Sequence, residues 1–213
     1  MTATGLAGAI LAGGRSSRMQ GPDKALVDLA GKPLLQHVLD RLAPQVSRLA
    51  LCVERPSAGM TVFGVEQLPD PGPGHRGPLG GVLSAMRRFA ASEPWLLVVP
   101  CDAPFLPLDL GQRLLARARE TGAPCVAVHW RGNRQPTFAL WSCGLLERLQ
   151  AAVAEEGLAG MWAFQDRCGV AQLEWPEEHP VANPPPFFNI NDPDALDRAR
   201  RWLAQEVDRK CSA

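Results

Sequence analysis

The residues best suited to chemistry lie in a glycine loop near the N-terminus. Gly13 and Gly14 follow a short apolar run, and Arg18 and Lys24 come soon after them. Glycines let the backbone approach a polyphosphate closely, and successive amide N–H groups can surround anionic oxygens. Arg18 and Lys24 can then neutralise phosphate charge. Because the loop matches neither GxxxxGK[ST] nor GxGxxG, we expect a phosphate site of neither the Walker nor the nicotinamide type.

Two isolated aspartates are candidate ligand contacts. Asp102 follows the most apolar run of the chain, residues 95–99, and is flanked by prolines. A lone carboxylate there suits Mg²⁺, which takes one or two carboxylates together with substrate phosphates. An Asx turn or a helix cap is the structural alternative for Asp102. Asp70 stands in a Pro-Asp-Pro-Gly sequence, which fits a ligand contact and an ordinary turn equally well.

The elements that must position these residues alternate between strand and helix through the first 130 residues. This rhythm predicts an α/β, Rossmann-like fold with a mostly parallel sheet and helices on both faces. Ligands bind such sheets at the carboxyl ends of the strands, near a topological switch point. We therefore expect the glycine loop, Asp70 and Asp102 to share one edge. The expected strands are 7–12, 49–53, 61–65, 95–99 and 125–128, and the expected helices are 33–42, 79–89 and 108–119.

After residue 130 the rhythm changes. Apolar patterns predict strands at 137–141 and 170–173 and a helix at 145–153. A charged amphipathic helix is expected at 192–206, with Asp192 as its N-cap and Pro193 at its first position. A length of 213 residues without an internal repeat predicts one domain.

Composition excludes several classes of function. The 22 basic and 22 acidic side chains balance, so the chain lacks the positive field that non-specific nucleic-acid binding requires. No apolar run approaches the roughly 18 residues of a transmembrane helix. The N-terminus has no signal-peptide pattern, and we therefore expect a cytoplasmic location and no membrane partner.

The chain offers no clear protein nucleophile. Ser16 and Ser17 have no predictable base partner, and the four histidines show no metal-ligand spacing. The six cysteines form no CxxC pair, so we expect reduced thiols that mostly fill the core. Phosphoryl or nucleotidyl transfer fits this composition, because positioning and electrostatics supply most of its catalysis.

An ordered set of motifs resembles a known family. The chain reads LAGG at 11–14 with Arg18-Met19 and Asp23-Lys24, then GPLGG at 77–81, PCDAPF at 100–105, PTFAL at 136–140 and FNIN at 188–191. This set is similar to that of nucleotidyltransferases with a glycosyltransferase-A-like Rossmann fold, and within that group to the molybdenum cofactor guanylyltransferases. The motifs span nearly the whole chain.

The resemblance implies Mg²⁺-dependent transfer of GMP from GTP to molybdenum-carrying molybdopterin, with release of pyrophosphate. It implies a nucleotide-binding half at about 1–130 and an acceptor-binding half at about 131–213. Arg18, Lys24 and Asp102 would be catalytic, with Asp102 also the metal ligand. The implied GTP contacts are Leu11, Ala12, Gly13, Gly14, Lys24, Asp70, Gly77 and Asp102, and the implied acceptor contacts are Asn189 and Asn191.

Partners and alternatives follow from the same resemblance. GTP and molybdenum-molybdopterin would be substrates, and molybdenum-insertion proteins, cofactor chaperones and apo-molybdoenzymes would be protein partners of a monomer. The alternatives are a molybdopterin cytidylyltransferase, a sugar-phosphate nucleotidyltransferase, and an inactive nucleotide-binding paralogue or chaperone. Cytidylyltransferase relatives tend to carry LAAG and GDMP-like segments, whereas this chain has LAGG and PCDAP. Cys52 and Gln20 depart from the family pattern.

Overall fold

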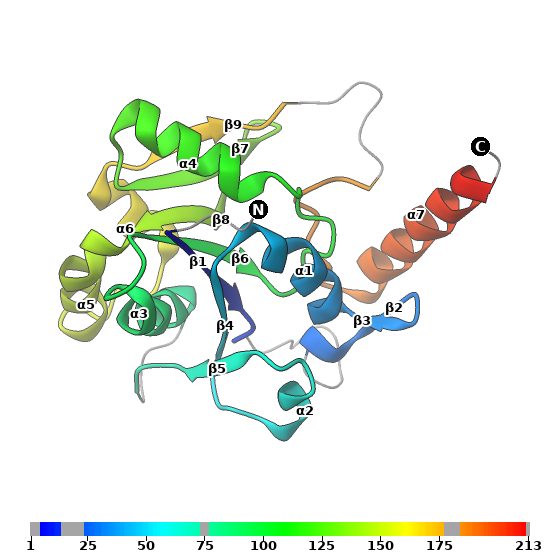
Figure 1. The fold of residues 1–213 in the computed structure, drawn as a ribbon, viewed down its shortest axis with the longest axis horizontal. Helices are drawn as coiled ribbons and strands as arrows, with labels where there is room; N and C mark the ends of the chain where they lie inside the picture. The colour runs from blue at the N-terminus through cyan, green and yellow to red at the C-terminus, as the bar shows by residue number, and fades with distance from the viewer. Residues whose placement is uncertain (1–4, 14–23, 73–76, 177–183, 212–213) are drawn as a thin grey trace.

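A seven-stranded sheet forms the centre of the molecule in a computed structural model that describes residues 5–13, 24–72, 77–176 and 184–211. Its strand order is β5-β4-β1-β6-β8-β7-β9 (Figure 1). Among the strands of this sheet, only β8 runs antiparallel to its neighbours, which confirms the predicted mostly parallel sheet. The strands are β1 (Leu6–Leu11), β4 (Arg48–Val53), β5 (Glu66–Pro69), β6 (Trp95–Pro100), β7 (Cys125–Trp130), β8 (Asn133–Ser142) and β9 (Ala171–Glu174).

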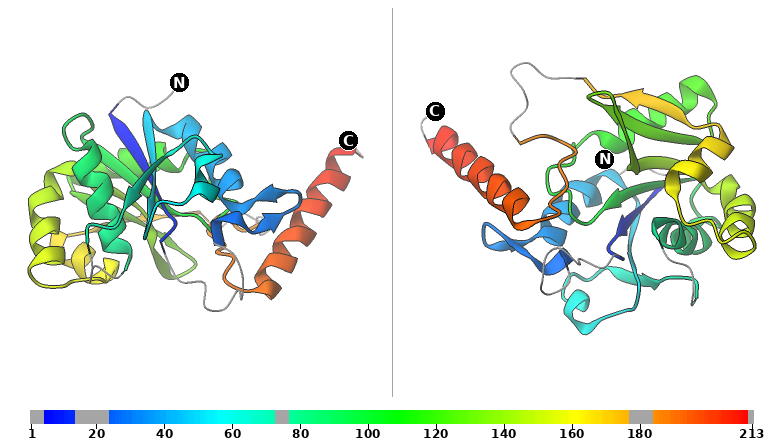
Figure 2. Two further views of the ribbon diagram at one scale, coloured as in Figure 1. Left: turned by 90° about the horizontal axis from the view of Figure 1, so that it is seen from below. Right: turned by 180° about the vertical axis from the view of Figure 1, so that it is seen from behind.

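Helices cover both faces of the sheet, as predicted. The helices α1 (Leu34–Leu42) and α4 (Leu110–Thr121) cover one face. The other face is covered by α3 (Pro78–Phe89), α5 (Leu146–Ala154) and α6 (Met161–Cys168). The layers and their helices can be followed in Figure 1 and, from two further sides, in Figure 2.

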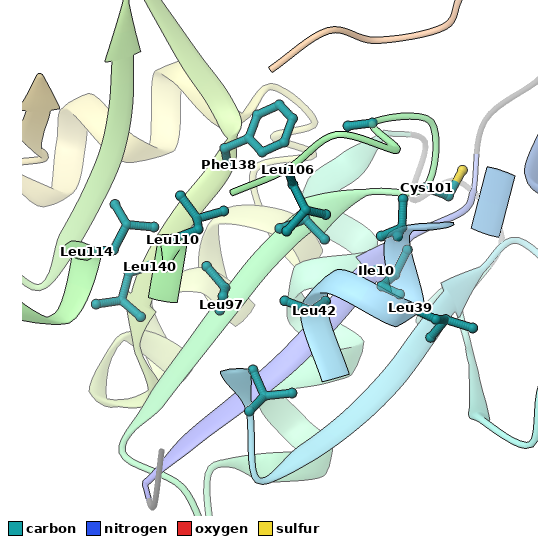
Figure 3. Close-up of a cluster of buried hydrophobic side chains, with 14 of the residues drawn as sticks. Ile10, Leu39, Leu42, Leu97, Cys101, Leu106, Leu110, Leu114, Phe138 and Leu140 are labelled. Carbon is teal, nitrogen blue, oxygen red and sulfur yellow. The ribbon is translucent and has the colours of Figure 1, made fainter. Parts of the chain in front are cut away.

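Strand periodicity explains the two apolar layers. Alternate side chains of β1 point to opposite faces, so Leu6 and Ile10 join one cluster while Ala7 and Ala9 join the other. Figure 3 shows Ile10 of β1 beside Leu39 of α1 in the first of these clusters. Full burial of such a side chain contributes about 1.5–3 kcal/mol. The sheet is therefore anchored on both sides by apolar contacts.

The C-terminal helix does not pack on the sheet. Helix α7 (Pro193–Cys211) lies beside a hairpin formed by β2 (Asp28–Leu29) and β3 (Lys32–Pro33), and it extends away from the body (Figure 2). A third, smaller apolar cluster joins them. Within it the Trp202 ring meets Phe188 at a centroid distance of 4.8 Å and Phe105 at 6.1 Å. Helix α7 thus holds the segment before it against the loop after β6.

The start of α7 is capped as predicted. Asp192 Oδ1 accepts a hydrogen bond of 2.7 Å from the backbone N–H of Ala195, and the helix begins at Pro193. Asp192→Ala should lower the free energy of unfolding by about 1 kcal/mol, because one N-terminal amide loses its partner. Urea denaturation measures this value. Asp192→Asn is the matched control and should stay close to the wild type, and a loss as large as that of the alanine variant would contradict the cap.

Some expected elements were wrong or missed. Residues 61–65 do not form a strand, because the short helix α2 (Ala58–Thr61) runs into a turn that ends at Gly64 with φ +65°. Val62 is 80% exposed there, so its apolar side chain marks no core strand. Helix α6 was not predicted, and α4 begins at Leu110 rather than at residue 108. The other expected elements are confirmed, with bounds that differ by a few residues.

The described cysteines are buried and form no disulfide bond with one another, as expected. They are Cys52, Cys101, Cys125, Cys143 and Cys168. Burial raises the pKa of Cys52 to about 12 and that of Cys143 to about 11. The thiols of Cys52 and Cys143 therefore stay protonated near neutral pH and serve as packing groups. No helix in the described part of the chain is long and apolar enough to cross a membrane.

The remaining short elements connect these layers. In the described part of the chain, single-turn 3₁₀ helices span Lys24–Leu26, Ala43–Gln45 and Cys143–Leu145. Gln45 is nearly buried, and its side chain donates to the carbonyl oxygens of Arg41 and Pro107 and accepts from the N–H of Gly111. One amide therefore fixes the end of α1, the loop after β6 and the start of α4 relative to one another.

Candidate active site

The candidate site lies where the strand order reverses. From β1 the chain adds β4 and β5 on one side, and β6 then pairs with β1 on the other. Backbone bonds continue past the strand ends, since Ala12 N donates to Cys52 O at 2.8 Å and Cys101 N to Leu11 O at 3.0 Å. Three chain segments therefore leave the same edge side by side. This is the switch point at which open parallel sheets bind ligands.

Three polar side chains from distant parts of the sequence meet at this edge. The Lys24 ammonium forms an ion pair with Asp102 Oδ2 and donates a hydrogen bond of 2.6 Å to Asn191 Oδ1. The side chains of Lys24 and Asp102 are 17% and 12% exposed. A charged pair so shielded from water is held more strongly than a surface pair. The predicted convergence of Lys24 with Asp102 is thus confirmed.

Local structure explains how each member is held. Lys24 begins a 3₁₀ turn whose next residue, Ala25, is fully buried and anchors it. Asp102 follows β6, and its carbonyl oxygen accepts a hydrogen bond of 2.9 Å from Ile190 N. Ile190 is itself fully buried, so the segment carrying Asn191 is fixed against Asp102. Sequence reasoning missed this anchoring role of Ile190, although an apolar residue between two asparagines was a signal for it.

In the segments that carry this cluster, two oxygens are buried without a hydrogen-bond partner among the described residues. They are Asp102 Oδ1 and Asn189 Oδ1. An unpaired buried carboxylate oxygen is costly, and such groups occur where a ligand or ion completes the site. Hard oxygen donors of this kind suit Mg²⁺, which keeps few protein ligands and binds substrate phosphates as well. These oxygen donors therefore have the chemistry that the implied metal requires.

Gly13 and Asp70 lie together on the far side of β1. A Cβ atom at Gly13 would lie 3.4 Å from the backbone nitrogen of Glu54 and 4.0 Å from Asp70 Oδ2. Asp70 N donates to Val53 O at 3.0 Å, which places Asp70 just past the end of β5. The expected placement of the glycine loop and Asp70 at one edge of the sheet is thus confirmed for Gly13. Gly14, Arg18 and Gln20 lie outside the described residues.

The GPLGG segment forms the start of α3. Gly77 has φ +122°, and a Cβ atom there would lie 2.9 Å from the carbonyl oxygen of Ala159. Gly81 lets the helix approach the sheet, because a Cβ atom there would lie 2.8 Å from Leu11 Cδ2. The Cys52 thiol donates to Gly81 O at 3.2 Å. Cys52 therefore points toward α3, where it packs the helix against the sheet.

The other expected contacts are placed as follows. Leu11 and Ala12 end β1, half-buried, beside the segment that carries Asp102. Asn189 lies in the same segment as Asn191, but the two differ, because Asn191 contacts Lys24 whereas Asn189 has an unpaired oxygen. No cluster of three or more His, Cys, Asp or Glu side chains suited to a metal occurs among the described residues.

A mostly parallel sheet with a polar cluster at its switch point is an arrangement that α/β nucleotide-binding folds use. Solved structures share the fold. Molybdopterin-guanine dinucleotide biosynthesis protein A of Archaeoglobus fulgidus has a TM-score of 0.77 at 22% identity, over 93% of this chain and 99% of its own. A CMP:2-keto-3-deoxy-manno-octonic acid synthetase solved with CTP has a TM-score of 0.67 at 15% identity, over 94% and 98%.

Relatives found by sequence identify the family more specifically than the solved structures do. The model of the MobA-like NTP transferase domain matches residues 8–170. The molybdenum cofactor guanylyltransferase of Rhizobium meliloti (strain 1021) is 39% identical over 94% of this chain and 93% of its own. That of Rhodopseudomonas palustris (strain BisB5) is 39% identical over 90% and 91%. The chain belongs to this family of MobA-like nucleotidyltransferases.

Proposed function

We propose that the protein transfers GMP from GTP to molybdenum-carrying molybdopterin and releases pyrophosphate. The observation that carries the proposal is the cluster of Lys24, Asp102 and Asn191 at the switch point. The relatives named as molybdenum cofactor guanylyltransferases support the choice of substrates. In this reaction a terminal phosphate oxygen of the pterin bonds to the α-phosphorus of GTP. The bond from that phosphorus to the oxygen bridging the β-phosphate breaks, and pyrophosphate leaves.

Lys24 is the proposed phosphate-binding cation. Its ammonium contacts Asp102 and Asn191, so a nucleotide would exchange at least one of these contacts for phosphate oxygens. The cation then stabilises negative charge that develops as the leaving group departs. Arg18 is proposed to assist it. Leu11, Ala12, Gly13, Gly14, Asp70 and Gly77 are the proposed nucleotide contacts.

Asp102 is the proposed metal ligand, through the oxygen that Lys24 leaves unpaired. When bound, Mg²⁺ would neutralise charge on the triphosphate and polarise the phosphorus under attack. Ile190 holds the backbone of Asp102, so the carboxylate keeps its position as nucleotide enters. Asn189 carries the other unpaired oxygen and is the proposed acceptor contact. Asn191 contacts Lys24, and we propose that it orients that cation as well as facing the acceptor.

Nucleotide-dependent thermal stability tests the proposal. GTP with Mg²⁺ at about 100 times its Kd should stabilise the fold by about 2.7 kcal/mol, a Tm increase of roughly 5–10 °C for a chain of this size. CTP, ATP and UTP at the same concentration should give much smaller shifts. A preference for CTP would indicate a cytidylyltransferase and contradict the proposal. Absence of any shift would contradict the nucleotide site altogether.

Turnover then tests the acceptor. Pyrophosphate release should require GTP, Mg²⁺ and molybdenum-carrying molybdopterin together. A sugar 1-phosphate offered in place of the pterin should give none. Release with the sugar phosphate alone would identify a sugar nucleotidyltransferase, and a nucleotide-dependent Tm shift without turnover on either acceptor would indicate a nucleotide-binding paralogue.

A further inference from the structure

A second cavity lies away from the switch-point cluster. It has a volume of about 240 Å³ and is bounded by α1, the loop after β6, the start of α4 and the ends of β7 and β9. Lys24, Asp102 and Asn191 do not line it. Its size is below the roughly 300–1,000 Å³ of sites for drug-sized ligands. A single ring system with one anionic group fits this volume better than a whole nucleoside triphosphate.

The cavity is strongly cationic. Among the described residues, Arg41, Arg113 and Arg131 line it together with one carboxylate, Asp109. Arg113 uses its Nε to contact Asp109 at 2.6 Å, in an ion pair of which both side chains are 44% exposed. Pairs this exposed contribute little, so the carboxylate neutralises the cavity only in part. An anion entering it would meet an excess of positive charge.

Aromatic rings accompany two of these cations. The Arg113 guanidinium lies 4.5 Å from the centre of the Trp175 ring, and the Arg131 guanidinium lies 4.6 Å from the centre of the Trp130 ring. Both rings line the cavity, and Phe105 lines it as well. Guanidinium and indole planes offer stacking surfaces to a flat ring, while the guanidinium N–H groups bind an anionic group in bidentate fashion.

Arg131 is an exposed cation of the cavity lining. It occupies the first position of the two-residue turn between β7 and β8, with φ +50°. Asn, Asp or Gly is the usual residue at this position, because glycine has no Cβ atom and the short polar side chains of Asn and Asp can hydrogen-bond locally. Among the described residues, its guanidinium contacts the ring of Trp130 and has neither a carboxylate nor a carbonyl partner. The strained backbone thus presents an unpaired cation at the cavity.

We propose that this cavity is a second binding site, for an anionic molecule with a planar heteroaromatic ring. A pterin and a purine nucleotide share this chemistry. The lining segments also connect the cavity to the switch-point cluster, since Phe105 follows Asp102 by three residues and Pro186 precedes Asn189 by three. A molecule bound in the cavity would therefore contact the segments that hold Asp102. The proposal does not depend on the identity of the transferred nucleotide.

Binding of pterin-6-carboxylate, a fluorescent planar anion, tests the proposal by fluorescence anisotropy. Arg131→Asn should weaken binding by about 10- to 100-fold, because a charge-assisted contact is lost. This variant should fold normally, since asparagine is well suited to the turn. Arg119→Asn removes an exposed arginine of α4 that does not line the cavity, and it should bind as the wild type does.

Several outcomes would overturn the proposal. The first is that the wild type does not bind pterin-6-carboxylate. The second is that Lys24→Met abolishes binding while Arg131→Asn leaves it intact. The third is that inorganic phosphate displaces the probe equally well, which would indicate a plain anion site. Competition by GMP distinguishes a site for purine nucleotides from a site for pterins. Displacement by GMP identifies a site that accepts purine nucleotides, whereas its absence, with binding lost in Arg131→Asn, identifies a site selective for pterins.

Discussion

Asp102→Asn should lower kcat by about 10²- to 10³-fold and raise the Mg²⁺ concentration required for half-maximal activity. The substitution keeps the size of the side chain but removes its charge. Asp102 carries the unpaired, buried oxygen that we assign to the metal, and its other oxygen contacts Lys24. Both contacts of the carboxylate depend on its charge, so the neutral amide weakens them together. Steady-state pyrophosphate release over a range of Mg²⁺ concentrations measures the effect.

The fold itself should survive this change. The backbone of Asp102 stays fixed by Ile190, and Lys24 keeps its contact with Asn191. Asp194→Asn is a matched control, because Asp194 is an exposed residue in the first turn of α7, away from the site. The control should retain wild-type turnover. Full Mg²⁺-dependent activity in Asp102→Asn would show that this carboxylate is not the metal ligand.

Lys24→Met should lower kcat/KM by about 10²-fold or more and reduce the stabilisation of the fold by GTP. Methionine preserves much of the apolar stem but removes the ammonium that we assign to the phosphates. Lys24→Arg should restore little activity, because a planar guanidinium cannot occupy the place of a compact ammonium between Asp102 and Asn191. Initial rates at varied GTP concentration, with the Tm shift measured in parallel, separate binding from turnover.

Lys32→Met provides the comparison for Lys24→Met. Lys32 also forms an ion pair with an aspartate, Asp40, but both side chains are 44% exposed and they lie on the hairpin and α1. This variant should keep wild-type kinetics. Equal kinetic effects at Lys24 and Lys32 would mean that a general loss of charge, rather than the switch-point site, explains the result.

The double variant reports whether the two residues act as one unit. Lys24→Met combined with Asp102→Asn should lose much less activity than the product of the two single losses predicts, because each single change already disrupts the same cluster. Strictly multiplicative losses would indicate that Lys24 and Asp102 stabilise the reaction independently. The ion pair between them would then belong to the nucleotide-free protein only.

Local patterns were sufficient to predict most of the fold. Each buried strand of the first half is a short apolar run, and the helices that cover the sheet repeat their apolar residues at helical spacing. The pattern failed at residues 61–65, where Val62 is exposed, because hydrophobic composition alone does not reveal which side chains the fold buries. It also missed α6, whose short apolar face is defined by packing against β8 and α5.

The sequence by itself determined that a glycine loop, a lysine and a lone aspartate leave the strands of a parallel sheet at one edge, because parallel strands direct their carboxyl ends the same way. Only the tertiary structure decided which of these groups touch. The contact of Asn191 with Lys24 spans 167 positions and depends on how α7 and the preceding segment dock against the loop after β6. The cationic cavity likewise forms between α1, α4, β7 and β9. No local sequence pattern specifies which side chains from such distant segments lie together.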